Sequence, residues 1–230
     1  VYSDIQERGI FTNNGFYLKS FERSLAEYCG LDDIVVVNSG TSALMLALQA
    51  MEINGDLVTT AFTFAATVNA AAILNKKIRF SSIDPTNLNL LPPKYGQREL
   101  QAIGGILPVH CYGNICDSEG MAQVAIKANV PLIYDAAHAF GIFNNKGQSV
   151  MQLGDISVTS FHATKVLSAI EGGAIYSHDA DVMKKFRVLR NFGLSEDGLV
   201  QDISLNSKMS EIHAAVGLLN LRYLKEDIEV

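Results

Sequence analysis

One lysine, Lys165, follows a strand-like apolar run and precedes a glycine pair in DISVTSFHATKVLSAIEGGA, residues 155–174. A lysine amine that is partly withdrawn from water, or that lies near other cations, loses its proton more easily and becomes a nucleophile. Most lysines are instead solvated surface residues, so position alone assigns Lys165 no role. Two further stretches also place reactive groups directly after a strand-like apolar run.

The first stretch, VVVNSGTSALMLAL at 35–48, has the pattern of a strand, a glycine turn and a helix opened by Thr41 or Ser42. Free backbone N–H groups and the positive end of the helix dipole form an anion site at such a helix start. Gly40 lets the backbone approach a ligand closely, and the hydroxyls add donors. Serine and threonine also serve routinely as helix N-caps, which explains them without a ligand.

The second stretch, PLIYDAAHAFG at 131–141, ends an apolar strand on Asp135 and continues to His138. A carboxylate in this position is poorly solvated and needs a cation or a strong hydrogen-bond donor. The alternatives are a helix-capping aspartate and a structural histidine whose hydrogen bonds are satisfied within the fold.

An anion cradle, a buried carboxylate and a strand-end lysine are together the parts that pyridoxal 5'-phosphate (PLP) requires. The cradle takes the phosphate, the carboxylate keeps the pyridine nitrogen protonated, and the lysine forms a Schiff base. An aromatic face against the ring is also wanted, and Phe64 follows the apolar run at 57–60. The sequence therefore predicts a PLP site.

These residues must be positioned by a sheet, and short β-branched runs recur along the chain. Most are nearly continuous in apolar residues, which is typical of strands buried on both faces. We expect strands at 34–37, 57–60, 78–83, 106–109, 132–134, 156–159 and 174–176. Helical patterns alternate with them at 18–29, 41–51, 65–74, 117–129, 179–191 and 209–227.

This alternation predicts an α/β fold with a mostly parallel (mixed) sheet of about seven strands flanked by helices. In such sheets ligands bind beyond the carboxyl ends of the strands, so the three reactive stretches are expected at one edge. Two long irregular segments, 84–104 and 193–207, are candidates for binding loops.

Composition and missing motifs narrow the classes of function. The 230 residues carry a formal net charge of -6, which gives no electrostatic reason to expect nucleic acid or an anionic membrane as partner. No apolar run approaches the roughly 18 residues of a membrane span, and the three cysteines favour a reducing compartment. We therefore expect a soluble, cytoplasmic protein.

Other site types lack their signatures. The sequence contains no G-x-G-x-x-G after a strand, no P-loop and no G-x-S-x-G elbow. The cysteines and histidines near residue 110 have no spacing typical of a structural zinc site, so no metal is expected.

Six motifs occur in an order that resembles the DegT/DnrJ/EryC1/StrS aminotransferases. They are NSGTSAL, TFAAT, YDAAHAFG, SFHATK…EGGA, RNFG and LNSKMSEIHAAVG, and the N-terminal FTNNGFYLKSFERSLAEYCG is similar as well. The resemblance covers nearly the whole chain. It implies a fold-type-I PLP enzyme acting on a nucleotide-linked keto sugar.

The resemblance also implies roles for individual residues. Lys165 would carry the Schiff base, Asp135 would face the pyridine nitrogen, His138 would lie beside the ring, and Phe64 would stack on it. The phosphate would be held by Gly40, Thr41 and Ser160, with Ser42 a weaker candidate. Asn206 would reach the phosphate of a neighbouring subunit, which implies a homodimer with shared active sites.

The implied reaction is transamination from glutamate to a dTDP- or UDP-linked keto sugar, with Lys165 as general base and acid. A PLP-dependent dehydratase or aromatizing enzyme and a non-catalytic regulatory homologue are the alternatives. Residues 1–230 would form the PLP-binding large domain, and the family's C-terminal small domain would be absent from them. We expect these residues alone to bind the cofactor less well, or turn over more slowly, than a longer chain.

Overall fold

The strands of the computed structural model, which describes residues 1–228, lie in two ladders joined edge to edge. One ladder has the order β1-β7-β6-β5 and the other the order β3-β2-β4. Isolated parallel bridges from Ile106 to Leu132 and from Val109 to Asp135 place β4 beside β5. The strands are β1 (Val35–Val37), β2 (Asp56–Thr60), β3 (Ile78–Ser81), β4 (Ile103–Ile106), β5 (Ile133–Asp135), β6 (Ile156–Ser160) and β7 (Gly173–Ser177).

Strand β7 gives the sheet its mixed character. It runs antiparallel to both β1 and β6, whereas β2 pairs in parallel with β3 and β4, and β5 pairs in parallel with β6. The strands β1, β2, β6 and β7 are buried along their whole length. Burial on both faces explains the continuous apolar sequence of β1, whereas β2, β6 and β7 also bury serine or threonine side chains.

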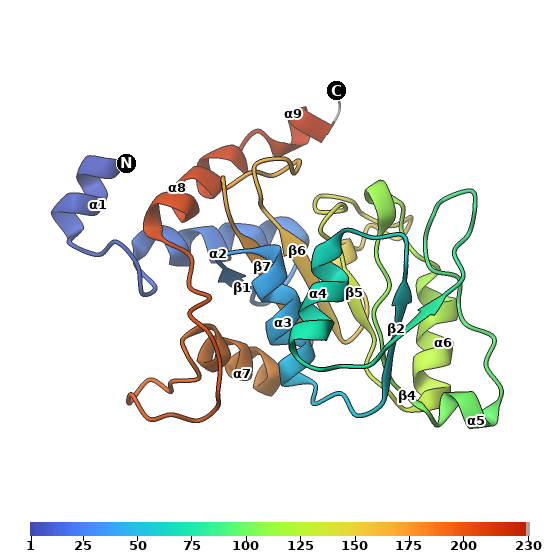
Figure 1. Cartoon of the computed structure of the whole chain (residues 1–230). Coiled ribbons are helices and arrows are strands. Elements are labelled where there is room, and N and C mark those ends of the chain that lie inside the picture. Colours follow the sequence, from blue (N-terminus) through green and yellow to red (C-terminus); the bar gives the residue numbers. More distant parts are fainter. Residues whose placement is uncertain (229–230) are drawn as a thin grey trace.

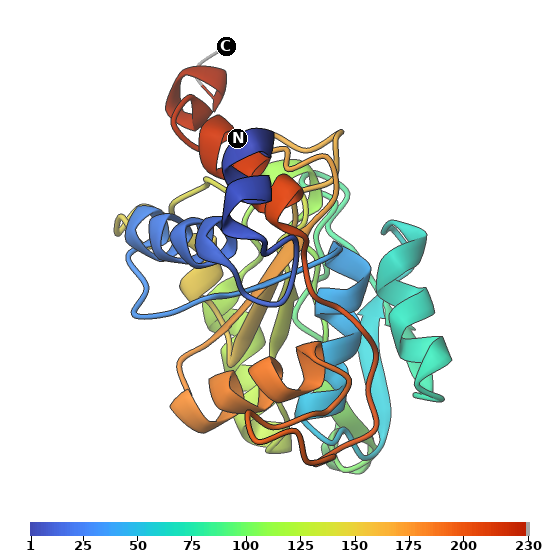
Figure 2. The ribbon, with the colours of Figure 1, turned by 90° about the vertical axis from the view of Figure 1, so that its left-hand side faces the viewer.

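Helices cover both faces of the sheet, with α2 on one side and α3 and α4 on the other (Figures 1 and 2). The helices are α1 (Tyr2–Arg8), α2 (Phe16–Cys29), α3 (Gly40–Ala50), α4 (Ala65–Ile73), α5 (Gln97–Leu100), α6 (Ser118–Ala128), α7 (Ala180–Arg190), α8 (Glu211–Asn220) and α9 (Leu224–Ile228). Short 3-10 turns lie at Cys111–Gly113 and Val150–Gln152. The predicted α/β class with a mixed sheet is confirmed.

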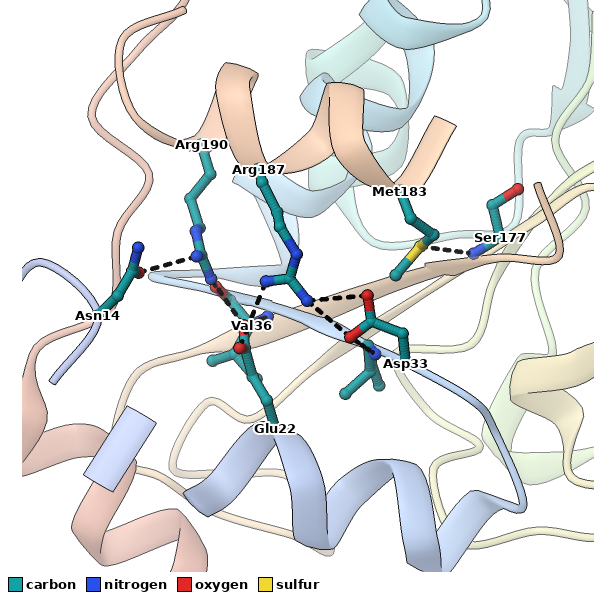
Figure 3. A network of polar contacts seen from close by, with 9 residues as sticks. Asn14, Glu22, Asp33, Val36, Ser177, Met183, Arg187 and Arg190 are labelled. Atoms are coloured by element: carbon teal, nitrogen blue, oxygen red, sulfur yellow. Dashed lines mark hydrogen bonds and ion pairs between the residues drawn. The ribbon is translucent and has the colours of Figure 1, made fainter. Parts of the chain in front are cut away.

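A buried polar network holds the free edge of β1 (Figure 3). Glu22 on α2 accepts the N–H of Val36 at 2.9 Å, and the Arg190 guanidinium on α7 donates to the Val36 carbonyl at 2.8 Å. Arg190 also pairs with Glu22 at 2.7 Å and donates to Asn14 at 2.8 Å. Side chains therefore satisfy a strand edge that has no neighbouring strand within residues 1–228.

The start of α2 is capped by a residue from the other end of the chain. Its N-cap residue, Gly15, has no side chain to accept a hydrogen bond. The buried carboxylate of Glu211 accepts the N–H groups of Tyr17 at 2.7 Å and Leu18 at 3.1 Å instead. A Cβ on Gly15 would lie 2.5 Å from the Glu211 carboxyl carbon, so glycine is required for this approach.

Three predicted elements differ from the structure. The strand expected at 106–109 is wrong, because β4 occupies Ile103–Ile106 and contains Gly104 and Gly105. Glycine lowers strand propensity, but a Cβ on Gly104 would clash with the Asn54 carbonyl, so packing overrides propensity. The helix expected at 209–227 is two helices, α8 and α9, and the segment 84–104 contains α5 and the start of β4.

Membrane-spanning helices and clustered metal ligands are two features that can be checked in the described residues. Within residues 1–228, no helix has the length and apolar character that crossing a membrane demands. No three histidine, cysteine, aspartate or glutamate side chains in that range converge as a metal site.

Candidate functional site

A cavity of about 460 Å³ opens at the carboxyl ends of β5 and β6. It is bounded by the start of α3, the start of α4, and the loops that follow the two strands. Seven of the nine predicted site residues line it: Gly40, Thr41, Phe64, Asp135, His138, Ser160 and Lys165. The predicted convergence at one sheet edge is therefore present in the structure.

The start of α3 presents backbone donors to this cavity. Ser39 is the N-cap, and its hydroxyl accepts the N–H of Ser42 at 3.1 Å. The N–H groups of Gly40 and Thr41 donate to no acceptor within residues 1–228. Together with the helix dipole, these two donors make the cavity wall favourable for an anion.

Gly40 has a packing role that the sequence did not indicate. A Cβ at this position would lie 2.8 Å from the Cβ of Ser160, at the end of β6. On the other side, a Cβ on Gly173 would lie 2.7 Å from the Gly40 nitrogen. The glycines therefore bring α3 close to β6 and β7, which places the helix start next to the Ser160 hydroxyl.

Asp135 ends β5 and is only 4% exposed. Its carboxylate accepts the Thr67 hydroxyl at 2.8 Å and the Ala137 N–H at 3.0 Å. Burial raises the pKa of Asp135, while these hydrogen bonds and the nearby His138 and Lys165 act in the opposite direction. The predicted need for hydrogen-bond donors at this carboxylate is met.

Thr67 is a site residue that the sequence reasoning missed. It lies in the first turn of α4, is buried, and hydrogen-bonds the Thr63 hydroxyl at 2.8 Å. Because its own proton goes to Asp135, Thr63 must be the donor in that contact. A threonine on the buried side of an alanine-rich helix was the available signal.

Lys165 lies in a turn five residues beyond the end of β6 and is half-buried. Its backbone N–H donates to the His162 carbonyl at 2.9 Å. Burial lowers the pKa of the Lys165 amine, and the charge of Asp135 opposes this shift. The amine is therefore neutral in a larger fraction of molecules than a solvated lysine at the same pH.

His138 is held by stacking rather than by hydrogen bonds. Its ring lies parallel to that of Tyr112, with centroids 5.6 Å apart and planes 7° apart. Its Nδ1 is buried without a hydrogen-bond partner in the described chain, and burial lowers the pKa of the ring. Tyr112, which the sequence reasoning also missed, is 70% exposed and adopts a left-handed φ of 50°.

Phe64 lies at the N-cap position of α4, where the chain is extended. The residue is 71% exposed, although it lines the cavity. An aromatic face is thus available at the cavity wall, as the predicted stacking role requires.

Two predicted residues do not line the cavity. The Ser42 hydroxyl donates to Asn38 Oδ1 at 2.7 Å and contacts the Ser39 hydroxyl at 2.9 Å, so it stabilises the turn before α3. Asn206 is exposed outside the cavity, and its carbonyl accepts the Asn38 side chain at 3.1 Å. Its role toward a neighbouring subunit stays a prediction.

A family profile described as the DegT/DnrJ/EryC1/StrS aminotransferase family matches residues 2–230. Among curated proteins, the dTDP-4-amino-4,6-dideoxy-D-glucose transaminase of Shigella dysenteriae is 43% identical over 214 residues. That match covers 93% of this chain and 58% of the Shigella protein. The chain therefore spans less than two thirds of the length of this relative.

Solved structures show the same architecture. DesI, crystallised in the presence of its TDP-sugar product, superposes with a TM-score of 0.90 at 32% identity, over 98% of this chain and 57% of DesI. NtdA from Bacillus subtilis, with the bound cofactor PMP, gives a TM-score of 0.86 at 28% identity, over 97% of this chain and 52% of NtdA.

Proposed function

Because the chain belongs to the DegT/DnrJ/EryC1/StrS aminotransferase family, we propose that it is part of a PLP-dependent transaminase of nucleotide-linked keto sugars. The proposed amino donor is glutamate. The observation that carries this proposal is the convergence of Lys165, Asp135 and the start of α3 on one cavity. The naming of the Shigella relative as a dTDP-amino-sugar transaminase supports the substrate class.

The residues present fit the cofactor. The free N–H groups of Gly40 and Thr41, with the Ser160 hydroxyl, suit a phosphate group. The buried Asp135 carboxylate suits a protonated ring nitrogen, since such a cation would offset the cost of burying its charge. The unpartnered Nδ1 of His138 and the exposed face of Phe64 leave polar and aromatic contacts available to a ring.

When bound, PLP supplies an electron-withdrawing ring that stabilises negative charge at the carbon bearing the transferred amino group. The chain's own residues do the rest. Lys165 Nζ would hold the cofactor covalently and, once released, would act as general base toward the proton on that carbon and, in its protonated form, as general acid within the same half-reaction. Its lowered pKa favours the neutral amine that covalent attachment and proton abstraction both require.

The proposal also covers the domain that the chain forms and its contact with a second copy. Residues 1–230 form the cofactor-binding large domain, and Asn206, exposed beside the α3 turn, contacts the phosphate held by a second copy. The extent of the match, 58% of the Shigella relative, supports assigning the whole reaction to a protein of the relatives' length.

The test is covalent capture of PLP followed by amino transfer. We expect the purified chain to bind PLP with a visible absorption band and, after borohydride reduction, to carry the cofactor on the peptide containing Lys165. Lys165→Ala should lose the band, whereas Lys146→Ala, an exposed lysine paired with Glu119, should keep it. Transfer of ¹⁵N from labelled glutamate to a dTDP- or UDP-linked 4-keto sugar would then identify the acceptor. Capture at another lysine would contradict the assigned site.

A further inference from the structure

Three polar side chains at the rim of the cavity have no role in holding the proposed cofactor. His162, Thr164 and Glu171 come from the loop between β6 and β7, which also carries Lys165. They line the same cavity as the Lys165 amine. A group bound between them would therefore lie beside the reacting centre.

The ends of this loop are fixed by the core. The Phe161 N–H donates to the Gly172 carbonyl at 2.8 Å, and the Ala169 N–H donates to the Phe161 carbonyl at 2.8 Å. The buried Phe161 ring packs against Phe21 and Phe140 at 5.4 and 5.3 Å between centroids. The fold therefore sets where the rim side chains stand.

The hydrogen bonds of His162 define which ring nitrogen faces Glu171. The Thr164 backbone N–H donates to His162 Nδ1 at 3.3 Å, and the Thr164 hydroxyl lies 2.9 Å from the same nitrogen. Because a backbone N–H only donates, Nδ1 is an acceptor, and the neutral ring carries its proton on Nε2. That Nε2 lies 3.7 Å from Glu171 Oε1.

A separation of 3.7 Å is too long for a direct hydrogen bond. Neither the Nε2 proton nor the Glu171 carboxylate has another hydrogen-bond partner within residues 1–228, and both side chains are about half exposed. The hydrogen-bond donor His162 Nε2 and the hydrogen-bond acceptor Glu171 Oε1 therefore lie next to each other, and both are available to a ligand.

A hydroxyl group suits this pairing. A hydroxyl both accepts and donates, so a single hydroxyl can accept from His162 Nε2 and donate to Glu171 Oε1. A carboxylate repels other anions, which disfavours the diphosphate of a sugar nucleotide or the carboxylates of glutamate at this point. A neutral, hydroxyl-bearing sugar ring meets both conditions.

We propose that His162 and Glu171 form a hydroxyl-binding subsite that holds the sugar ring of the acceptor beside Lys165, with Thr164 orienting the imidazole. The inference rests on the proposed function, because it assigns a part of the acceptor to this rim. His162 and Glu171 touch the substrate, and Thr164 is a positioning residue.

The experiment measures the affinity of unreactive sugar nucleotides for the PLP-loaded chain by titration calorimetry. The probe is the tightest binder among dTDP-, UDP- and GDP-glucose, together with its monodeoxy analogues. We expect His162→Ala and Glu171→Ala to weaken binding by roughly tenfold, and Glu171→Gln by less, since its amide oxygen still accepts. The wild type should lose a similar factor for the analogue that lacks the bound hydroxyl.

Measuring a subsite variant with a deoxy analogue tests whether the subsite binds the hydroxyl that the analogue lacks. If the subsite binds that hydroxyl, Glu171→Ala should cause no further loss with the matching deoxy analogue. His178→Ala and Glu119→Gln are matched controls, since His178 contacts the Gln152 carbonyl and Glu119 pairs with Lys146; both should bind like the wild type.

Two measurements separate the possible failures. Mass spectrometry after borohydride reduction reports whether Lys165 captured PLP in each variant, and loss of capture in the wild type overturns the proposed function itself. With the cofactor captured, unchanged affinities in the His162 and Glu171 variants overturn the subsite alone. Failure of all three sugar nucleotides to bind the loaded wild type overturns the subsite as well.

Discussion

At the scale of single residues, Lys165 and Asp135 influence each other's protonation. Burial lowers the pKa of the Lys165 amine, and the Asp135 charge opposes that shift. Removing the negative charge in Asp135→Asn should therefore move the Lys165 pKa further down. The measurement is an NMR titration of the cofactor-free chain after reductive ¹³C-methylation of its lysines.

In that titration, Lys165 should lose its proton at a lower pH than the exposed lysines, and at a still lower pH in Asp135→Asn. Asp117→Asn, which alters the N-cap of α6, should not change the pH at which Lys165 is half-protonated. A midpoint that stays constant or rises in Asp135→Asn would show that the two groups do not interact as described.

Thr67 is the second residue whose contribution can be isolated. Thr67→Val keeps the shape of the side chain but leaves one oxygen of the buried Asp135 carboxylate without its donor. We expect a loss of about 1–3 kcal/mol in the free energy of unfolding. Thr63→Val removes only the donor to Thr67, so it should cost less. Urea unfolding of both variants checks this order, and equal losses would contradict it.

At the scale of elements, α2, α7 and β1 are held together by the Arg190 network (Figure 3). Arg190 is 2% exposed, and Arg190→Met would leave the Glu22 carboxylate with only its longer contact to Arg187, at 3.4 Å. Breaking a buried pair costs about 3–5 kcal/mol, and the remaining Arg187 contact should keep this loss near the lower end of that range. Arg23→Met, at an exposed position of α2, should change stability by less than about 0.5 kcal/mol.

A double variant tests whether this loss comes from the pair. Adding Glu22→Gln to Arg190→Met removes the carboxylate charge that has lost its nearer partner, so the double variant should lose less stability than the sum of the two single losses. Chemical unfolding of the four proteins gives the interaction energy. Strict additivity would mean that Glu22 and Arg190 stabilise the fold independently.

The elements were predictable where local sequence and burial agree. Strand β1 is VVV and is buried throughout; Asp135 was found because it follows the apolar run 132–134, and Lys165 because it follows the strand-like run 156–159. Strand β4 was misplaced because Gly104 and Gly105 are required by the neighbouring backbone, which sequence propensity does not register. Thr67 on α4 and Tyr112 in the turn at Cys111–Gly113 contact site residues far away in the sequence, and only the tertiary packing reveals these partners.

At the scale of the whole molecule, stability should depend on pH through a buried histidine. His110 is fully buried, stacks on Tyr134 with centroids 4.6 Å apart, and accepts the Cys116 N–H through Nδ1 at 3.1 Å. Burial lowers the pKa of His110 from 6.5 to about 3. Between these values the unfolded chain binds a proton that the folded chain does not, so the folded state loses stability as the pH falls.

The expected loss from His110 is at most about 1.4 kcal/mol per pH unit. His110→Asn keeps an acceptor for the Cys116 N–H but cannot titrate, so its unfolding free energy should fall less steeply between pH 6.5 and pH 4. Urea unfolding at several pH values compares the slopes, with His178→Asn as an exposed control. Identical slopes for His110→Asn and the wild type would contradict the assignment.

The capping of α2 by Glu211 has a consequence for how the chain is made. The contacts from Glu211 to Tyr17 and Leu18 join residues 194 and 193 positions apart. During synthesis from the N-terminus, α2 therefore emerges long before the carboxylate that completes its first turn. Local helix formation cannot finish this element, because its capping group lies 194 positions further along the chain than Tyr17. A ribosome-bound chain that stops before residue 211 should expose the start of α2 to proteases and chaperones until synthesis continues.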